Sequence, residues 1–307
     1  MPRAPDLFRG CARGCAGLRR RGDPRLTGGG PVPCVSVIIP AFRARDSLPA
    51  ALASVAASGL PPAGIEVVLA PDDGDSYDGL PEHGLRLVRC APDHVASGAG
   101  AARNRALARA RAPIVAFLDA DDSWEPGYLA ALLPLAGRHG VAFGRTRVLC
   151  DGRPLIVLPG TERAHLVLDD LGTGASFHPV MARALAGPFR SLPSQDVLHA
   201  AEALSAAGGE APLAPVHYNL HLNPRSATAD RGFALRVQGA YARILREIAL
   251  GRTRLRPEHR EAARAAFEAK ARLNRAYMRE GARRPFYAFL SERMARPAAR
   301  VTDGSPR

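Results

Sequence analysis

Short apolar runs and amphipathic segments alternate along the first 120 residues of the chain. The apolar runs are rich in Val, Ile and Leu, which is typical of strands buried on both faces of a parallel sheet, and they occupy residues 35–39, 65–70, 85–89 and 114–118. Helices are expected to begin near Leu48 and Ala99, and Pro40 is expected to end the first strand. Strands separated by helices predict a doubly wound, mostly parallel α/β sheet with helices on both faces.

The last quarter of the chain is predicted to be helical. Apolar residues recur at helical spacing over 233–248 and 267–278, and an aromatic segment follows at 285–290. Charge divides the chain in the same way, because residues 1–33 carry a net +5, residues 34–230 a net −4 and residues 231–307 a net +12. We therefore expect three parts, which are a disordered basic extension over 1–33, an α/β domain over 34–230 and a basic helical region over 231–307.

Aspartates crowd the ends of two predicted strands. The second strand runs into Asp72 and Asp73, and the fourth runs into Asp119, Asp121 and Asp122. Ligands of doubly wound sheets bind beyond the carboxyl ends of the strands. Like charges repel each other unless a cation lies between them, and hard divalent ions take carboxylate oxygens and bridge to substrate phosphates. A metal and diphosphate site is one interpretation, and ordinary turn chemistry is the other, above all for the first pair.

Four segments together resemble glycosyltransferase family 2 in both order and spacing. They are VSVIIPAF at 35–42, EVVLAPDDGDSYD at 66–78, GAARNRAL at 100–107 and IVAFLDADDSWEPGYL at 114–129. The resemblance covers roughly 35–205. It implies a GT-A-type fold and an inverting enzyme that moves a sugar from a nucleotide-diphosphate donor to an acceptor hydroxyl.

The resemblance also implies roles for individual residues. In that family an acidic pair after the second strand contacts the nucleotide base, and the DxD region holds the ribose and a divalent metal, Mn²⁺ or Mg²⁺. Carried onto this sequence, the metal ligands are Asp121 and Asp122. The expected nucleotide-binding residues are Pro40, Phe42, Asp72, Asp73, Arg103, Asn104 and Asp119.

Asp196 is the expected general base. The segment that begins at Ser194 resembles the second acidic element of the family, with Gln195 in the place of its usual Glu. Asp196 would take the proton of the acceptor hydroxyl as that oxygen attacks the anomeric carbon. One alternative is that Ser194 and Asp196 only cap the helix that follows. Gln195 keeps a second alternative open, a catalytically weak relative that binds nucleotide sugars.

Two further residues are candidates for the acceptor side of the site. Trp124 is expected either to stack on a sugar or to belong to the core. His178 precedes Pro179 in a loop that would suit an acceptor pocket, although a lone histidine is more often a structural group. The glycines at 98–103 lack the third member of a dinucleotide fingerprint, so no Rossmann cofactor is expected.

The charge distribution decides between classes of partner. A nucleic-acid-binding protein acting through its Arg-rich tails is the competing class, but the segment that carries the motifs is acidic, so no nucleic acid is expected. The expected partners are the nucleotide-sugar donor and a glycan or lipid-linked acceptor, in the synthesis of a bacterial cell-surface glycan.

The expected location is cytoplasmic. No stretch approaches the roughly 20 apolar residues of a membrane span, and the five cysteines form neither a disulfide framework nor a zinc pattern. The basic helices beyond 230 leave two interpretations open. Their apolar faces either lie in an anionic membrane surface, which gives peripheral contact at the inner face of the cell membrane, or pack on the α/β domain.

Overall fold

The computed structural model describes residues 32–91, 94–160, 162–222, 232–280 and 284–295, so most of the basic extension expected over 1–33 lies outside the described residues. The strands are β1 (Val35–Ala41), β2 (Ile65–Pro71), β3 (Arg86–Arg89), β4 (Ile114–Phe117), β5 (Ser123–Trp124), β6 (Val141–Cys150), β7 (Arg153–Leu158), β8 (His165–Val167), β9 (Pro179–Ala182) and β10 (Glu210–Leu222). The α-helices are α2 (Leu48–Ala56), α3 (Ala99–Arg109), α4 (Tyr128–His139), α5 (Gln195–Ala206), α6 (Phe233–Ala249), α7 (Arg260–Arg279) and α8 (Phe286–Ala295).

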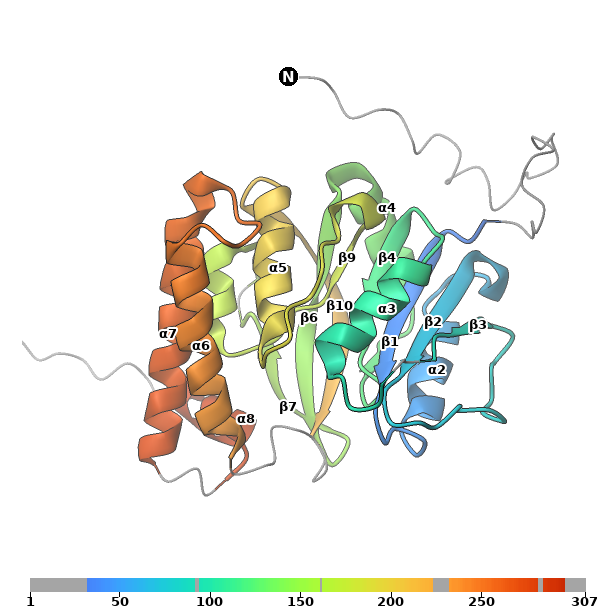
Figure 1. Ribbon diagram of the computed structural model, residues 1–307, viewed down its shortest axis with the longest axis horizontal. Coiled ribbons are helices and arrows are strands. Elements are labelled where there is room, and N and C mark those ends of the chain that lie inside the picture. The colour runs from blue at the N-terminus through green and yellow to red at the C-terminus, as the bar shows by residue number, and fades with distance from the viewer. Residues whose placement is uncertain (1–31, 92–93, 161, 223–231, 281–283, 296–307) are drawn as a thin grey trace, which may run out of the picture.

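A mixed sheet forms the centre of the molecule, with strand order β3-β2-β1-β4-β9-β6-β10-β5 (Figure 1). The half that contains β3, β2, β1 and β4 is parallel, as the apolar runs predict. Strand β9 is antiparallel to both β4 and β6, and β10 returns parallel to β6. The turn after β4 nevertheless reaches β10, about 100 residues later in the chain, because the N–H of Asp119 donates a hydrogen bond to the Tyr218 hydroxyl.

Helices cover both faces of this sheet, and each face has its own apolar cluster. Along β1, Val37 and Ile39 point to the side that α2 and α4 cover, and Ile38 points to the side of α3 and α5. The alternation follows from the pleat of the strand, which turns successive side chains to opposite faces. The predicted α/β class with helices on both faces is confirmed.

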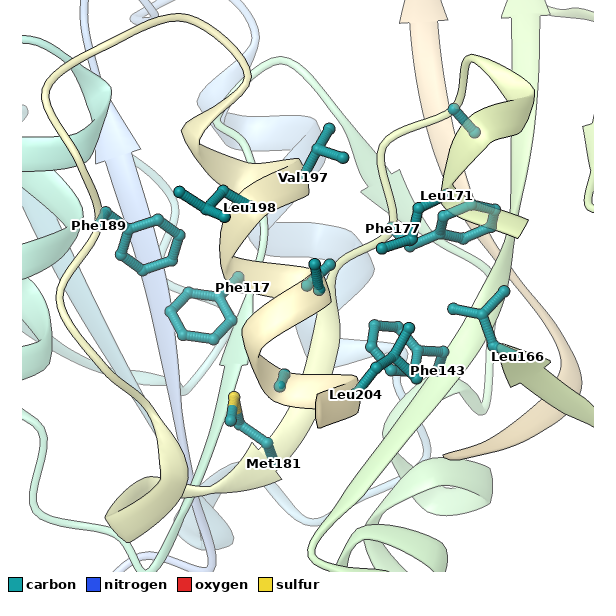
Figure 2. Packing of buried hydrophobic residues seen from close by; sticks show 14 of the residues in the cluster. Phe117, Phe143, Leu166, Leu171, Phe177, Met181, Phe189, Val197, Leu198 and Leu204 are labelled. Atoms are coloured by element: carbon teal, nitrogen blue, oxygen red, sulfur yellow. The ribbon is translucent and has the colours of Figure 1, made fainter. Parts of the chain in front are cut away.

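Aromatic side chains fill the face that α5 covers. Figure 2 shows Phe117 of β4 beside Phe189 and Leu198, while Phe143 of β6 packs near Leu204. The rings of Phe117 and Phe189 meet edge to face at 5.2 Å. Burying each such side chain stabilises the fold by about 1.5–3 kcal/mol, so this cluster holds α5 against the sheet.

The helices beyond residue 230 pack into the same cluster. Val237, Tyr241, Ile244 and Ile248 form the buried face of α6, and α6 and α7 lie beside α5 in Figure 1. The apolar faces are thus covered by protein, which agrees with the second of the two interpretations. Peripheral contact with an anionic membrane stays a prediction that depends on exposed arginines. Among the described residues no helix is long and apolar enough to cross a membrane.

The expected end of the first strand at Pro40 is wrong. Strand β1 continues to Ala41, and Pro40 pairs in register with Ala70 of β2. On its other side β1 pairs with β4 only as far as Ile38, opposite Phe117. Pro40 therefore lies where β1 has become an edge, and an edge position tolerates the missing N–H.

Gly144 of β6 offers a test of the packing between the sheet and α4. A Cβ atom at this position would lie 2.5 Å from Cε2 of Tyr128 and 2.9 Å from the carbonyl oxygen of Val216. Because such overpacking strains a close-packed core, we expect Gly144→Ala to lower the free energy of unfolding by about 1–3 kcal/mol in urea titrations. Gly239 in α6 is the control, since a Cβ there meets nothing within 4 Å. Gly239→Ala should raise the stability by about 0.5–1 kcal/mol, and equal effects of both changes would contradict the packing described.

Candidate active site

A cavity of about 570 Å³ opens at the carboxyl end of β4. Both the α/β domain and the helices beyond residue 230 line it. Its ionisable and polar lining residues include Arg103, Asp119, Asp121, Asp122, His178, Asp196, His221 and Lys270. Six of the residues proposed from the sequence therefore share one cavity, although they come from α3, the turn after β4, the loop before β9 and α5.

Asp119 forms an ion pair with Arg103 of α3 at the floor of this cavity. Arg103 is only 3% exposed, and its guanidinium carbon lies 5.4 Å from the ring centre of Phe189. Burial opposes ionisation of Asp119, but the charge of Arg103 and its hydrogen bond to the carboxylate outweigh it, so the pKa of Asp119 is lowered. The Nε and Nη1 groups of Arg103 find no acceptor among the described residues.

Asp122 is the buried member of the carboxylate group. Its two oxygens accept hydrogen bonds from the Tyr218 hydroxyl at 2.8 Å and from the backbone N–H of His221 at 2.9 Å. Burial, together with the charges of Asp121 and Asp119, raises the pKa of Asp122 well above its ordinary value. Negative charge is therefore in excess at this corner, which is the electrostatic setting that a cation would relieve.

A divalent cation fits these carboxylates if water and substrate phosphates supply its remaining ligands. The carboxylates are hard oxygen donors, but within the described ranges no group of three or more His, Cys, Asp and Glu side chains is arranged to hold a metal ion. Mg²⁺ and similar ions are commonly held by one or two carboxylates, with water and substrate phosphates as the other ligands. Asp121 and Asp122 are the residues that would hold the ion in that way.

Asp72 and Asp73 do not line the cavity, and both are hydrogen-bonded to other residues of the chain. Asp72 is buried and accepts hydrogen bonds from the Ser97 hydroxyl, from the Gly98 N–H at 2.7 Å and from Arg105 at 3.1 Å. Burial raises the pKa of Asp72, but these hydrogen bonds outweigh it and lower the pKa overall. These bonds let Asp72 hold Ser97 and Gly98, which line the cavity, and its contact with a nucleotide base stays a prediction.

Asp73 links two loops at the surface. It accepts hydrogen bonds from the backbone N–H of Arg43 and, at 2.7 Å, from the Tyr77 hydroxyl. The neighbouring Phe42 is 50% exposed, and Pro40 is partly buried in β1. Asp73, Phe42 and Pro40 lie outside the lining of the cavity, and their contact with a nucleotide stays a prediction.

Asn104 and Trp124 are held by other residues of the chain, and their contacts with a ligand stay predictions. The Asn104 amide exchanges hydrogen bonds of 3.0 and 2.7 Å with the backbone of Phe189, so Asn104 ties α3 to that loop and does not line the cavity. Trp124 is 2% exposed and stacks on Tyr128 at 4.9 Å. Trp124 therefore belongs to the core on the opposite face of the sheet, which was the other interpretation of this residue.

His178 and Asp196 do face the cavity. His178 stacks on Tyr218 at 4.4 Å, its Nε2 lies 3.8 Å from Asp119, and neither ring nitrogen finds a hydrogen-bond partner among the described residues. Burial lowers the pKa of His178, which keeps the ring neutral at pH 7. Asp196 lies in the first turn of α5, where Ser194 makes no side-chain capping bond. Ser194 is thus the N-cap residue of α5 by position, but its side chain does not cap the helix as the alternative interpretation requires.

The sequence did not single out Tyr218, His221 or Lys270 as site residues. Tyr218 carries no local signal, because its hydroxyl reaches Asp122 and the backbone of Asp119 across nearly 100 residues. Lys270 does carry one, since it is the only lysine of the chain.

Residues 36–170 match the family model described as glycosyl transferase family 2. This segment belongs to glycosyltransferase family 2. Over 134 residues the chain is 34% identical to TuaG of Bacillus subtilis (strain 168), named for teichuronic acid biosynthesis, which covers 40% of this chain and 51% of TuaG. The chain therefore spans about half the length of this relative.

Solved structures share the fold. S. aureus TarS 1–349 in complex with UDP-GlcNAc matches with a TM-score of 0.57 at 20% identity, over 80% of this chain and 72% of TarS. The mannosyltransferase PcManGT from Pyrobaculum calidifontis, in complex with GDP-Man and Mn²⁺, matches with a TM-score of 0.52 at 19% identity, over 86% and 80%. These similarities confirm the GT-A-like architecture that the family resemblance implies.

The structural task of Asp72 can be tested through its pH dependence. Because the folded protein lowers the pKa of Asp72, its stabilising effect is present above the unfolded pKa of about 3.9 and is lost as the pH falls through the folded value. We expect Asp72→Asn to cost about 1–3 kcal/mol in urea unfolding at pH 7, with a smaller difference at pH 3.

Asp78 provides the matched control for this change. Its side chain is 75% exposed and lies 3.5 Å from Arg89, a surface pair worth at most about 1 kcal/mol. Asp78→Asn should therefore be nearly neutral. An Asp72→Asn protein as stable as the Asp78→Asn protein at pH 7 would show that Asp72 does not hold the rim.

Proposed function

We propose that the chain is a metal-dependent inverting glycosyltransferase that moves a sugar from a nucleotide-diphosphate donor to an acceptor hydroxyl. The observation that carries the proposal is that Arg103, the carboxylates after β4 and Asp196 line a single cavity. A cationic group, an acidic metal-binding turn and a separate carboxylate are the three parts that such a transfer needs. Membership of the family and the relatives in glycan synthesis support the same reaction class.

The donor diphosphate would lie between Arg103 and Asp121. Arg103 has two buried groups, Nε and Nη1, without acceptors among the described residues, and its planar guanidinium matches phosphate oxygens. Asp119 holds Arg103 in place by the ion pair, so Arg103 is oriented before the donor arrives. A bound divalent cation would stabilise the charge that develops on the departing diphosphate. The UDP and GDP-Man complexes of the structural relatives support a nucleotide sugar as donor.

Asp196 would act as the general base. The acceptor oxygen gives its proton to the Asp196 carboxylate, forms the new bond to the anomeric carbon and displaces the diphosphate oxygen, which leaves with the bonding electrons. Attack from the face opposite the leaving group inverts the configuration at that carbon. His178 is neutral and stacked on Tyr218, and it is placed to donate or accept a hydrogen bond beside the transferred sugar.

The acceptor is proposed to be a glycan or a lipid-linked sugar of a bacterial cell surface. TuaG, by its name, works in teichuronic acid biosynthesis, and TarS was solved with UDP-GlcNAc. We place the protein in the cytoplasm, where nucleotide sugars are made, with the basic surface of α6 and α7 available for peripheral contact with an anionic membrane.

Ligand-induced stabilisation tests the donor and the metal together. A panel of UDP, GDP, dTDP, CDP and ADP would be scanned by thermal shift with Mn²⁺ or with EDTA. A ligand at 100 times its Kd adds about 2.7 kcal/mol, which for a domain of this size raises Tm by roughly 5–10 °C. We expect one nucleotide to give this rise with Mn²⁺, and Asp121→Asn to abolish the part that depends on Mn²⁺. The exposed Asp169→Asn change is the control. A full Mn²⁺-dependent rise in the Asp121→Asn protein would contradict the metal assignment.

Single-turnover kinetics test the base. We expect Asp196→Asn to lower the rate of transfer by about 10²- to 10⁴-fold, because the amide cannot accept the hydroxyl proton. Nucleotide binding should stay within about twofold of the wild type, since Asp196 does not touch the diphosphate in this scheme. The Asp169→Asn protein again serves as control. Transfer at the wild-type rate would leave Asp196 as a structural residue of α5.

A further inference from the structure

Position 270 differs from every other basic position of the chain, because it carries a lysine. The chain has 42 basic residues, and Lys270 is the only lysine among them. Lys270 lies on α7, is 3% exposed and lines the cavity together with Asp196. The chain carries lysine at this buried position and arginine at every other basic position.

The hydrogen bonding of Lys270 leaves donors unused. Its ammonium donates to the carbonyl oxygen of Ala175 at 2.9 Å, which is the one acceptor it finds among the described residues. An ammonium group carries three N–H donors, so two remain for a ligand in the cavity. A guanidinium is larger and planar with donors in a fixed fork, whereas an ammonium is compact and turns freely to meet oxygens at different angles.

The charge of Asp196, the proposed general base, acts on Lys270. Burial lowers the pKa of Lys270 to about 8, and the Asp196 carboxylate opposes this shift. Lys270 therefore stays mostly charged at neutral pH. Arg103 forms its ion pair with Asp119, and the charge of Asp196 acts on Arg103 as well as on Lys270.

The helices around Lys270 supply an apolar and aromatic wall. Phe233, Val237, Tyr241 and Tyr287 line the same cavity, and the Tyr241 phenol is hydrogen-bonded to the Ser194 side chain beside Asp196. Rings with few polar groups among them form the usual lining of a small-molecule site, where the polar groups fix orientation. A sugar ring offers both an apolar face for the wall and hydroxyl oxygens for the ammonium.

We propose that Lys270 is an acceptor-binding residue, whose ammonium donates hydrogen bonds to oxygens of the acceptor sugar while Asp196 faces the hydroxyl that reacts. This assignment rests on the proposed function. In this assignment the helices beyond residue 230 form one wall of the active site. The acceptor is then a ring of sugar size that carries several hydroxyl groups.

The single lysine makes a direct test possible. The wild-type protein would be treated with formaldehyde and cyanoborohydride, and methylation of Lys270 would be followed by peptide mass spectrometry, with p-nitrophenyl glycosides of glucose, galactose, mannose and N-acetylglucosamine as probes. We expect at least one glycoside to slow methylation about fivefold or more, and UDP with Mn²⁺ to slow it less than twofold. The proposal is overturned if no glycoside slows methylation, or if UDP slows it as much as the glycosides do.

Variants separate acceptor binding from a structural role. Lys270→Gln keeps an N–H donor for Ala175 but loses the charge, and Lys270→Met loses both. We expect both variants to raise the KM for the protecting glycoside about tenfold or more, with nucleotide Kd within twofold of wild type. Arg272→Met is the control, because Arg272 is 63% exposed on the same helix and its loss removes the same charge.

The outcomes distinguish this proposal from the proposed function. If Lys270→Gln behaves as wild type, Lys270 only holds Ala175 and the proposal is wrong, while nucleotide binding and the role of Asp196 stand. If the wild-type protein binds no nucleotide of the panel, the proposed function itself fails.

Discussion

Three carboxylates within four residues must share the end of β4, and the site is built around the repulsion between their charges. Asp119 is neutralised by Arg103, and Asp122 is held by Tyr218 and a backbone N–H of β10. Even so, the pKa of Asp122 stays well above its ordinary value, because burial and its two neighbours oppose its ionisation.

The repulsion between these carboxylates explains why distant segments of the chain meet at the end of β4. Arg103 comes from α3, and Tyr218 comes from β10 on the far side of the strand order. The Tyr218 hydroxyl accepts from the N–H of Asp119 at 3.0 Å while it donates to Asp122, so one phenol fixes both ends of the turn. The helices beyond residue 230 then close the cavity and bring Lys270 to Asp196. The site is thus a product of the whole fold, although the family motifs lie in its first half.

The sequence predicted those features that depend on local patterns along the chain. The buried strands were predicted because continuous apolar runs suit a parallel sheet, and the acidic turn because a strand end in such a sheet faces ligand. Asp72, Asn104 and Trp124 have partners within the protein, and their contacts with a ligand stay predictions. Ser97 is 25 residues from Asp72 and Phe189 is 85 residues from Asn104, so no local pattern in the sequence shows these two contacts in advance. The rarity of Lys270 was visible, but only its place in the cavity separates it from a bias in composition.

A crystal structure with UDP and Mn²⁺, measured at the manganese absorption edge, tests most directly that this carboxylate-rich cavity is the donor site. We expect one anomalous peak beside Asp121, with the diphosphate between that peak and the Nε and Nη1 groups of Arg103. A manganese peak outside the cavity, or UDP bound at the surface near Phe42 with Arg103 untouched, would contradict this assignment.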